Sequence, residues 1–175
     1  MAVYFPDHNV LYVHIPKTGG CLFYEILKET QINHRFVGYQ HSPPDMCGKE
    51  VYINKPFVYC FVREADSWYK SYWRWRVKGP HSFGLVGYDD ELWHPTWELE
   101  YCFGYDSYEV FKDNQFKNSP DFYYRMIEKY TKVKGFEYKI FRFENLLHGI
   151  KEIFDRLGYN KPIEYYKKLP KINAT

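Results

Sequence analysis

The chain has 175 residues, the size of one globular domain, and its apolar content of 45% supports a real core. Its net charge of +2 excludes the broad basic surface of a general nucleic-acid-binding protein, and its four cysteines lack the C-x-x-C spacing of a zinc site and suit a reducing compartment. No stretch resembles a signal peptide or reaches the length of a membrane span, so we expect one domain, residues 1–175, in the cytoplasm, without a membrane span.

The first predicted unit is a strand, a short loop and a helix. Residues 9–15 are apolar and rich in β-branched and aromatic side chains, which predicts a buried strand, and residues 20–30 carry apolar side chains at helical spacing. The loop contains Lys17 and the pair Gly19 and Gly20. Glycines let the backbone turn and approach a ligand, and the first N–H groups of a helix attract an anion. With the charge of Lys17, this loop predicts a site for phosphate or a similarly shaped anion.

The spacing of this loop differs from that of the common nucleoside triphosphate loop. That loop reads G-x-x-x-x-G-K-S/T, whereas the lysine of this chain precedes the glycines. The difference disfavours an ATPase or kinase, and a P-loop phosphotransferase stays an alternative. The glycine pair alone is also compatible with a plain strand–turn–helix connection that carries an incidental lysine.

The run HIPKTGG, residues 14–20, resembles the 5′-phosphosulfate loop of sulfotransferases that use 3′-phosphoadenosine 5′-phosphosulfate (PAPS), and is most similar to their glycan branch. The resemblance implies that the donor is bound by Lys17, Thr18, Gly19, Gly20, Cys21 and Leu22. That branch favours a threonine or serine pair where this chain has Cys21 and Leu22, so the loop would depend on backbone N–H groups and Lys17. Cys21 is either a reactive thiol at a helix N-terminus or a small buried residue.

A second strand–loop–helix unit follows further along the chain. Residues 57–62 are apolar throughout, as expected of a central strand in a parallel sheet, and a helix is predicted over residues 65–76. Arg63 lies directly after the strand. Because ligands bind outside the carboxyl ends of parallel strands, we expect Lys17 and Arg63 to face one crevice.

The run from Arg63 to Tyr72 resembles the 3′-phosphate element of the same family, R-D/E-P-x-x-R-x-x-S-x-Y/F. The resemblance implies that Arg63 and Ser71 bind the 3′-phosphate of PAPS. The planar fork of arginine suits phosphate oxygens. The proline and the second arginine of the family pattern are Ala65 and Trp68 in this chain. Taken alone, Arg63 also fits a surface charge at a strand end.

Residues 73–100 form the least regular segment and combine aromatic side chains with Arg74, Arg76 and Lys78. One interpretation is an acceptor-side lid or loop that binds an anionic glycan, and another is an aromatic loop that covers the core. Binding of single-stranded nucleic acid is a weaker third interpretation, since acidic residues 89–91 follow closely. We therefore expect no nucleic-acid partner.

The last third of the chain predicts further helices and one strand. The predicted elements are helices over residues 106–113 and 119–130, a strand over 138–143 and a helix over 145–157. Ser107 and Ser119 are candidate N-caps. The run RFENL, residues 142–146, resembles a strand-to-helix element of the family in which Glu144 fixes the turn, and residues 169–175 resemble the segment that leads into a nucleotide-covering region.

These units predict an α/β fold with a parallel β-sheet flanked by helices. The resemblance further implies the P-loop nucleotide-kinase-like fold of sulfotransferases and an enzyme that moves a sulfonate in line from PAPS to a hydroxyl, with a carbohydrate as the expected acceptor. The implied partner is a glycan or another hydroxyl-bearing acceptor, and no metal ion is implied. A protein that binds PAPS or its product PAP (adenosine 3′,5′-bisphosphate) without turnover is the main alternative.

The catalytic residues follow from the same chemistry. Lys17 would stabilise the charge that develops during transfer, and a histidine suits the removal of a proton from a hydroxyl. We assign the base to His41, which follows the predicted extended run 35–39 and resembles in position the base of the uronyl branch. His81 and His94 are second choices and Glu64 is a distant one, while His14 is expected to pack or to orient the loop.

Overall fold

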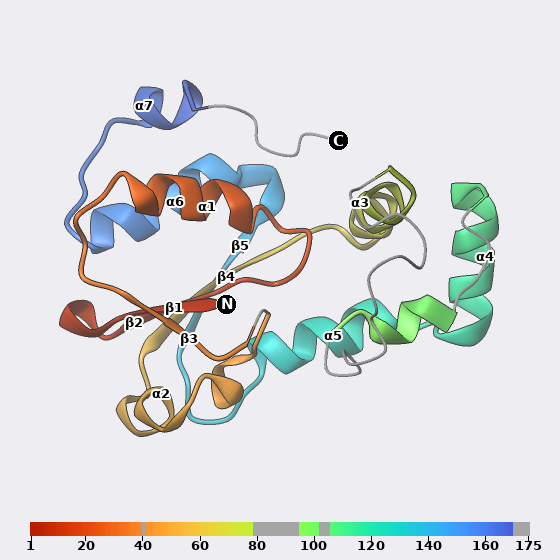
Figure 1. Cartoon of the computed structure of the whole chain (residues 1–175), viewed down its shortest axis with the longest axis horizontal. Helices are drawn as coiled ribbons and strands as arrows, with labels where there is room; N and C mark the ends of the chain where they lie inside the picture. Colours follow the sequence, from red (N-terminus) through yellow and green to blue (C-terminus); the bar gives the residue numbers. More distant parts are fainter. Residues whose placement is uncertain (40, 79–94, 102–105, 170–175) are drawn as a thin grey trace. The chain divides into compact units, whose positions relative to one another are not determined.

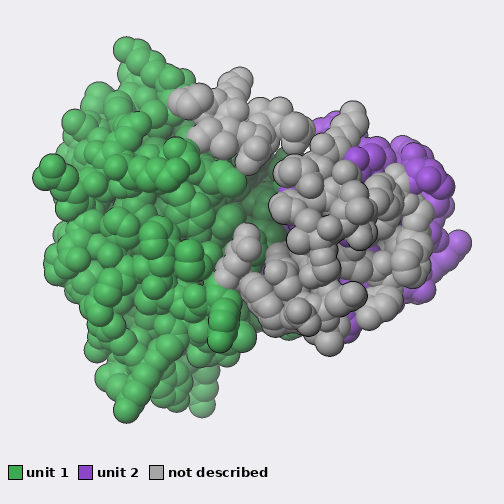
Figure 2. Space-filling view, in the orientation of Figure 1, with its two compact units in different colours: residues 1–63, 128–174 green, residues 64–127, 175 purple. Residues whose placement is uncertain are grey.

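The structure, a computed structural model, describes residues 1–39, 41–78, 95–101 and 106–169. The chain forms two compact units, one of residues 1–63 with 128–174 and one of residues 64–127 (Figure 2). The single domain expected from the length of the chain stays a prediction.

The first unit is built on a five-stranded sheet in the order β3-β1-β2-β4-β5 (Figure 1). The strands are β1 (Ala2–Phe5), β2 (Val10–Val13), β3 (Arg35–Val37), β4 (Phe57–Val62) and β5 (Tyr138–Arg142). Strands β2, β4 and β5 run parallel, with Val13 opposite Cys60 and Cys60 opposite Ile140. The predicted α/β class, a sheet flanked by helices, is confirmed.

The sheet is mixed, because β1 runs antiparallel to both β2 and β3. Only a one-turn 3-10 helix, η1 (Pro6–His8), and Asn9 separate β1 from β2. So short a connection can join antiparallel strands but is too short for a parallel crossover. No sequence pattern predicts a strand at residues 2–5, and β1 adds two antiparallel strand pairs to the predicted parallel ones.

Helices α1 and α6 lie over one face of the sheet and α2 lies towards the other (Figure 1). The helical segments of this unit are α1 (Gly20–Lys28), α2 (Lys49–Asn54), α6 (Leu146–Arg156), α7 (Ile163–Lys167) and the 3-10 helices η2 (Pro44–Met46) and η5 (Phe143–Asn145). The apolar faces of α1 and α6 join the sheet in one buried cluster, in which Tyr12 of β2 stacks on Phe23 of α1 at 3.6 Å between ring centroids. This packing fixes the start of α1 against the end of β2, where the predicted loop lies.

The second unit is helical in its described part. It contains α3 (Ala65–Lys78), the 3-10 helix η4 (Trp97–Tyr101), α4 (Tyr108–Asn118) and α5 (Phe122–Thr131), whose last residues belong to the first unit. Its core is aromatic: Trp68 and Tyr72 of α3 are fully buried and stack in parallel, and Phe111 of α4 packs against Tyr72.

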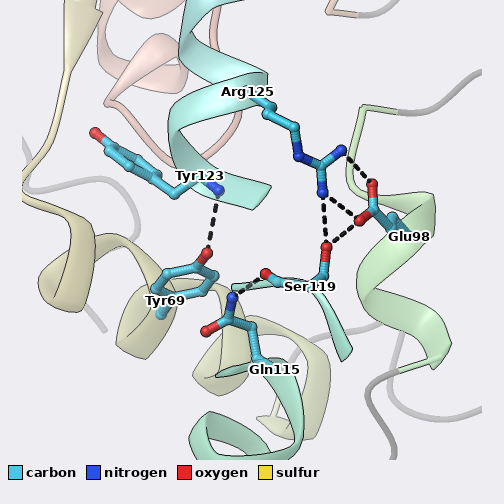
Figure 3. A network of polar contacts seen from close by, with 6 residues as sticks. All are labelled: Tyr69, Glu98, Gln115, Ser119, Tyr123 and Arg125. Carbon is cyan, nitrogen blue, oxygen red and sulfur yellow. Dashed lines mark hydrogen bonds and ion pairs between the residues drawn. The ribbon is translucent and has the colours of Figure 1, made fainter. Parts of the chain in front are cut away.

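A polar network joins the helices of the second unit (Figure 3). The guanidinium of Arg125 donates to both carboxylate oxygens of Glu98, at 3.1 and 2.5 Å, and to the Ser119 hydroxyl at 2.8 Å. Gln115 donates to the Ser119 carbonyl at 2.5 Å. The backbone N–H of Tyr123 donates to the hydroxyl of Tyr69, a buried residue of α3. These bonds hold η4 to α4 and α5.

The predicted helices and strands occur close to their expected bounds, with exceptions that have local causes. Ser107 is an N-cap as predicted, since its hydroxyl accepts from the N–H of Val110. The predicted cap at Ser119 is wrong, because that residue ends α4 and its hydroxyl pairs with Glu98 and Arg125. The core of the predicted lid, residues 79–94 with His81 and His94, and the tail from residue 170 lie outside the described residues.

No helix in the described part of the chain combines the length and the apolar character that crossing a membrane requires.

Candidate functional site

The loop between β2 and α1 is closed by its own threonine. The Thr18 hydroxyl donates to the Ile15 carbonyl at 2.7 Å, and Thr18 is fully buried. Lys17, just before it, has a left-handed backbone with φ of 62°, and Gly19 follows with φ of 89°. The side chain of Thr18 therefore stabilises the conformation of the loop. Lys17 is half-buried and gives the loop its positive charge.

Gly19 and Gly20 have no room for a side chain. A Cβ at Gly20 would lie 2.2 Å from the imidazole of His14, and a Cβ at Gly19 would lie 2.8 Å from Leu146 and 3.3 Å from the Phe143 ring. The glycine pair is thus required by packing between the His14 ring and the corner where η5 meets α6.

The N-terminus of α1 has no side-chain cap among the described residues. Gly19 is the N-cap and the first turn holds no acidic residue, so the positive end of the helix is not neutralised from within the helix. The Cys21 side chain is exposed, which excludes the buried interpretation. Leu22 packs against the core and its N–H donates to the Gly19 carbonyl at 3.1 Å. Such a helix end suits an anion.

Arg63 lies against the same loop, at the end of β4. Its guanidinium donates to the Lys17 carbonyl at 3.5 Å and sits over the Phe143 ring, 4.3 Å from the centroid. The structure therefore brings Lys17 and Arg63 together. Ser71, the other predicted 3′-phosphate contact, lies buried in α3 in the second unit, so its pairing with Arg63 stays a prediction.

The environment of Lys17 lowers the pKa of its ammonium group. Burial lowers the pKa of Lys17 to about 8; the Cys21 thiol opposes this shift and the Arg63 guanidinium adds to it. Lys17 is then mostly charged at neutral pH but loses its charge in the mildly alkaline range. Two cationic side chains held at one loop favour a ligand with more than one negative charge.

His41 is held at both its ring and its backbone. It is 8% exposed, its Nδ1 lies 2.9 Å from the His14 carbonyl, and its own carbonyl accepts from the Tyr130 hydroxyl at 2.7 Å. Because a carbonyl can only accept, Nδ1 must carry the proton and Nε2 must hold the lone pair. His41 is therefore fixed as the tautomer that a general base needs.

Four residues other than glycine have a positive φ in the described part of the chain: Asn9, Lys17, His41 and Lys55. Asn9 and Lys55 end short helices, where a left-handed backbone is common. Lys17 and His41, at φ of 62° and 61°, end no helix. Unusual backbone of this kind gathers at functional sites, and both residues are the predicted catalytic ones.

His14 lies between the loop and His41. The two imidazole rings are 4.6 Å apart between centroids, at 59°. Burial lowers the pKa of His14 well below its ordinary value, and His41, the amine of Met1 and Lys17 lower it further. His14 is therefore a neutral ring at physiological pH.

The corner between β5 and α6 also contributes residues to the candidate site, and the sequence motifs do not predict this. A cavity of about 290 Å³ is lined there by Phe143, Glu144, Asn145, Leu146, Leu147, His148, Ile163 and Lys167. Phe143 and Leu146 are the two residues that press on Gly19, so the cavity adjoins the loop. The RFENL run is the only sequence signal for this corner, and it draws attention to Glu144 rather than to the aromatic ring beside it.

Glu64, the distant candidate base, has a structural role. Its two carboxylate oxygens accept from the N–H groups of Asp66 and Ser67 at 3.0 and 2.7 Å, which caps α3. Within the described ranges, no group of three or more His, Cys, Asp or Glu side chains is arranged to hold a metal ion.

No family model matches the chain, and no curated protein matches its sequence. Among solved structures, it is similar to the mouse sulfotransferase SULT7A1 complexed with PAP, with a TM-score of 0.47 and 14% sequence identity. The match covers 90% of this chain and 60% of that one.

Proposed function

We propose that this chain binds PAPS at the Lys17 loop and transfers its sulfonate to a hydroxyl group. The observation that supports the proposal is that Lys17 and Arg63, which follow the ends of two neighbouring strands, lie together at one glycine loop. The helix that begins at this loop has no side-chain cap among the described residues. Such a set of groups suits a ligand with several negative charges on adjacent oxygens. The HIPKTGG resemblance identifies PAPS as the ligand of that kind to test first.

The charged groups of the site have separate tasks in this proposal. The bound donor would supply a sulfonate attached to a phosphate leaving group. Lys17 and the first N–H groups of α1 bind the oxygens on which charge increases during transfer, and loss of one such donor typically costs about 3 kcal/mol of barrier. Arg63 binds a phosphate, with Ser71 as its predicted second contact. The cavity beside Gly19 is large enough to take part of the nucleoside.

His41 accepts the proton of the acceptor. Its Nε2 lone pair removes the hydroxyl proton while the acceptor oxygen forms a bond to sulfur and the bond from sulfur to the bridging oxygen breaks. The electron pair of that bond stays with the phosphate of PAP, next to Lys17. The bond from His41 Nδ1 to the His14 carbonyl keeps the lone pair on Nε2 before each turnover.

The direct test of the proposal is a transfer assay with sulfur-labelled PAPS. The purified chain is incubated with labelled PAPS and a mixture of glycans and small alcohols, and label on the acceptors is measured with and without EDTA. The proposal expects labelled product that persists with EDTA and is lost in His41→Ala. Transfer from ATP in place of PAPS, dependent on Mg²⁺, would instead support the P-loop phosphotransferase alternative. A carbohydrate hydroxyl is the acceptor class to test first, as the resemblance to the glycan branch suggests.

A second candidate function is PAPS or PAP binding without turnover. It is supported by the position of His41, which is only 8% exposed, and by the Thr18 hydroxyl, which is engaged within the loop. This function expects tight binding of PAP with no labelled product from any acceptor. Calorimetry with PAP beside the transfer assay separates the two functions.

A further inference from the structure

The side chain of His14 connects two parts of the proposed site. Its ring fills the space beside Gly20, where a Cβ would come within 2.2 Å, and lies 4.6 Å from the His41 ring between centroids. Tyr24 of α1 packs against it edge-on at 5.5 Å. Three neighbours thus hold the imidazole in one position between the loop and the candidate base.

We propose that His14 is a positioning residue that orients His41, with its ring resting on Gly20 and its carbonyl accepting the His41 Nδ1 proton. This proposal rests on the proposed function, because it gives His14 a task in the same reaction. It assigns to one residue two of the contacts that fix the base. The ring limits how His41 can turn, and the carbonyl selects the tautomer.

The His14 ring acts by its flat shape and not by its charge. His41, Lys17 and the amine of Met1 face it, and each of them disfavours a second positive charge. Tyr24 also faces it, and because burial raises the pKa of Tyr24, that side chain is a neutral phenol. A smaller, non-planar side chain would leave space beside His41. The His41 ring could then rotate away from the carbonyl, and Nε2 would carry the proton in part of the molecules. A base in the wrong tautomer cannot accept the proton.

The first test measures the tautomer of His41 in the free protein. The ring nitrogens are observed by ¹⁵N NMR at a pH where His41 is neutral, in wild type, His14→Ala and His14→Phe. We expect a single tautomer with Nδ1 protonated in wild type, a mixture in His14→Ala, and the single tautomer again in His14→Phe. An unchanged His41 signal in His14→Ala would overturn the proposal. If that variant does not fold, His14→Leu, which keeps volume but not the flat ring, takes its place with the same expected mixture.

A matched control is offered by His34. It is also half-buried, its Nδ1 lies 2.8 Å from the Ile32 carbonyl, and it packs on Phe36 at 5.5 Å between ring centroids. His34→Ala should leave the tautomer of His41 unchanged. A change in His34→Ala equal to that in His14→Ala would mean that general loosening, rather than positioning by His14, controls His41.

The second test uses turnover. In His14→Ala we expect kcat to fall tenfold to a hundredfold with the KM for PAPS within about twofold, since the reacting group is misplaced while the donor contacts remain. A rise in KM with unchanged kcat would contradict this role. If wild type transfers no sulfonate but the tautomer responds as expected, the proposed function fails and the positioning of His41 by His14 stands. If wild type transfers sulfonate and the tautomer does not respond, only the proposal for His14 fails.

Discussion

Helices α1 and α3 each follow the end of a strand, and their N-termini are completed in different ways. The first turn of α3 is capped by the Glu64 carboxylate, which accepts from two of its N–H groups. The first turn of α1 has a glycine N-cap, no side-chain cap among the described residues and no acidic residue, and Lys17 stands beside it. The Glu64 carboxylate offsets the positive end of α3, whereas in the proposed function an anion from outside would offset the positive end of α1.

The largest effect should come from removing the charge at the α1 loop. Lys17→Ala should lower the kcat/KM of sulfonate transfer by about a hundredfold, the equivalent of about 3 kcal/mol. The measurement is the initial rate with labelled PAPS. Lys55→Ala is the matched control, since Lys55 is also a half-buried lysine with positive φ but packs on Tyr52 and Phe136. Equal losses in the two variants would contradict a special role for Lys17.

The next effect concerns the phosphate contact of Arg63. Arg63→Ala should weaken PAP binding tenfold to a hundredfold, because charge-assisted hydrogen bonds contribute about 1.5–3 kcal/mol. Titration calorimetry measures the change. Arg35→Ala, which removes an exposed arginine paired with Glu50 at 2.8 Å, should leave PAP affinity unaltered. If the Arg63→Ala variant binds PAP as tightly as wild type, Arg63 does not contact the phosphate of PAP.

A smaller effect should follow from pH. The pKa of Lys17 in the free protein is lowered to about 8, so its charge is present below that pH and lost above it. PAP affinity should therefore fall about fivefold between pH 8 and pH 9, because the charged fraction of Lys17 falls from about a half to about a tenth. The stability of the free protein should depend on pH in the opposite direction. Its free energy of unfolding should rise between pH 8 and 10.5, because the buried charge of Lys17 is lost over that range. Lys17→Arg, which stays charged, should bind PAP equally well at both pH values.

The smallest effect is expected at the α3 end. Glu64→Ala should lower the free energy of unfolding by about 1 kcal/mol, the usual value of a lost cap, and leave PAP affinity and transfer unchanged. Thermal unfolding and the transfer assay measure both. Glu64→Gln, which keeps one accepting oxygen, should lose less stability. A loss of transfer in Glu64→Gln at unchanged stability would instead make Glu64 the base.

The elements and the loop could be predicted because their signals are local. The apolar run 57–62 and the glycine pair after Lys17 each define a structure within a few residues, and β4 and the start of α1 are found there. β1, α2 and α7 could not be predicted in this way, since segments of four to six residues gain their structure from pairing and packing.

The site was predictable where a motif carries it and not where distant segments meet. The approach of Arg63 to Lys17 follows from parallel strands that end at one edge of a sheet. The contact of Phe143 with the loop, the burial of Thr18 and the neighbouring rings of His14 and His41 depend on packing between residues far apart in the chain. No residue spacing in the sequence predicts such contacts.

The proposed function requires that the Lys17 loop bind the nucleotide of a sulfonate donor. Titration calorimetry of the wild-type chain with PAP in EDTA tests it most directly, with Lys17→Ala and Arg63→Ala measured alongside. We predict saturable binding at one site per chain without a metal ion, weakened in both variants. Absence of PAP binding by the folded wild-type chain, or binding that both variants retain in full, would contradict it.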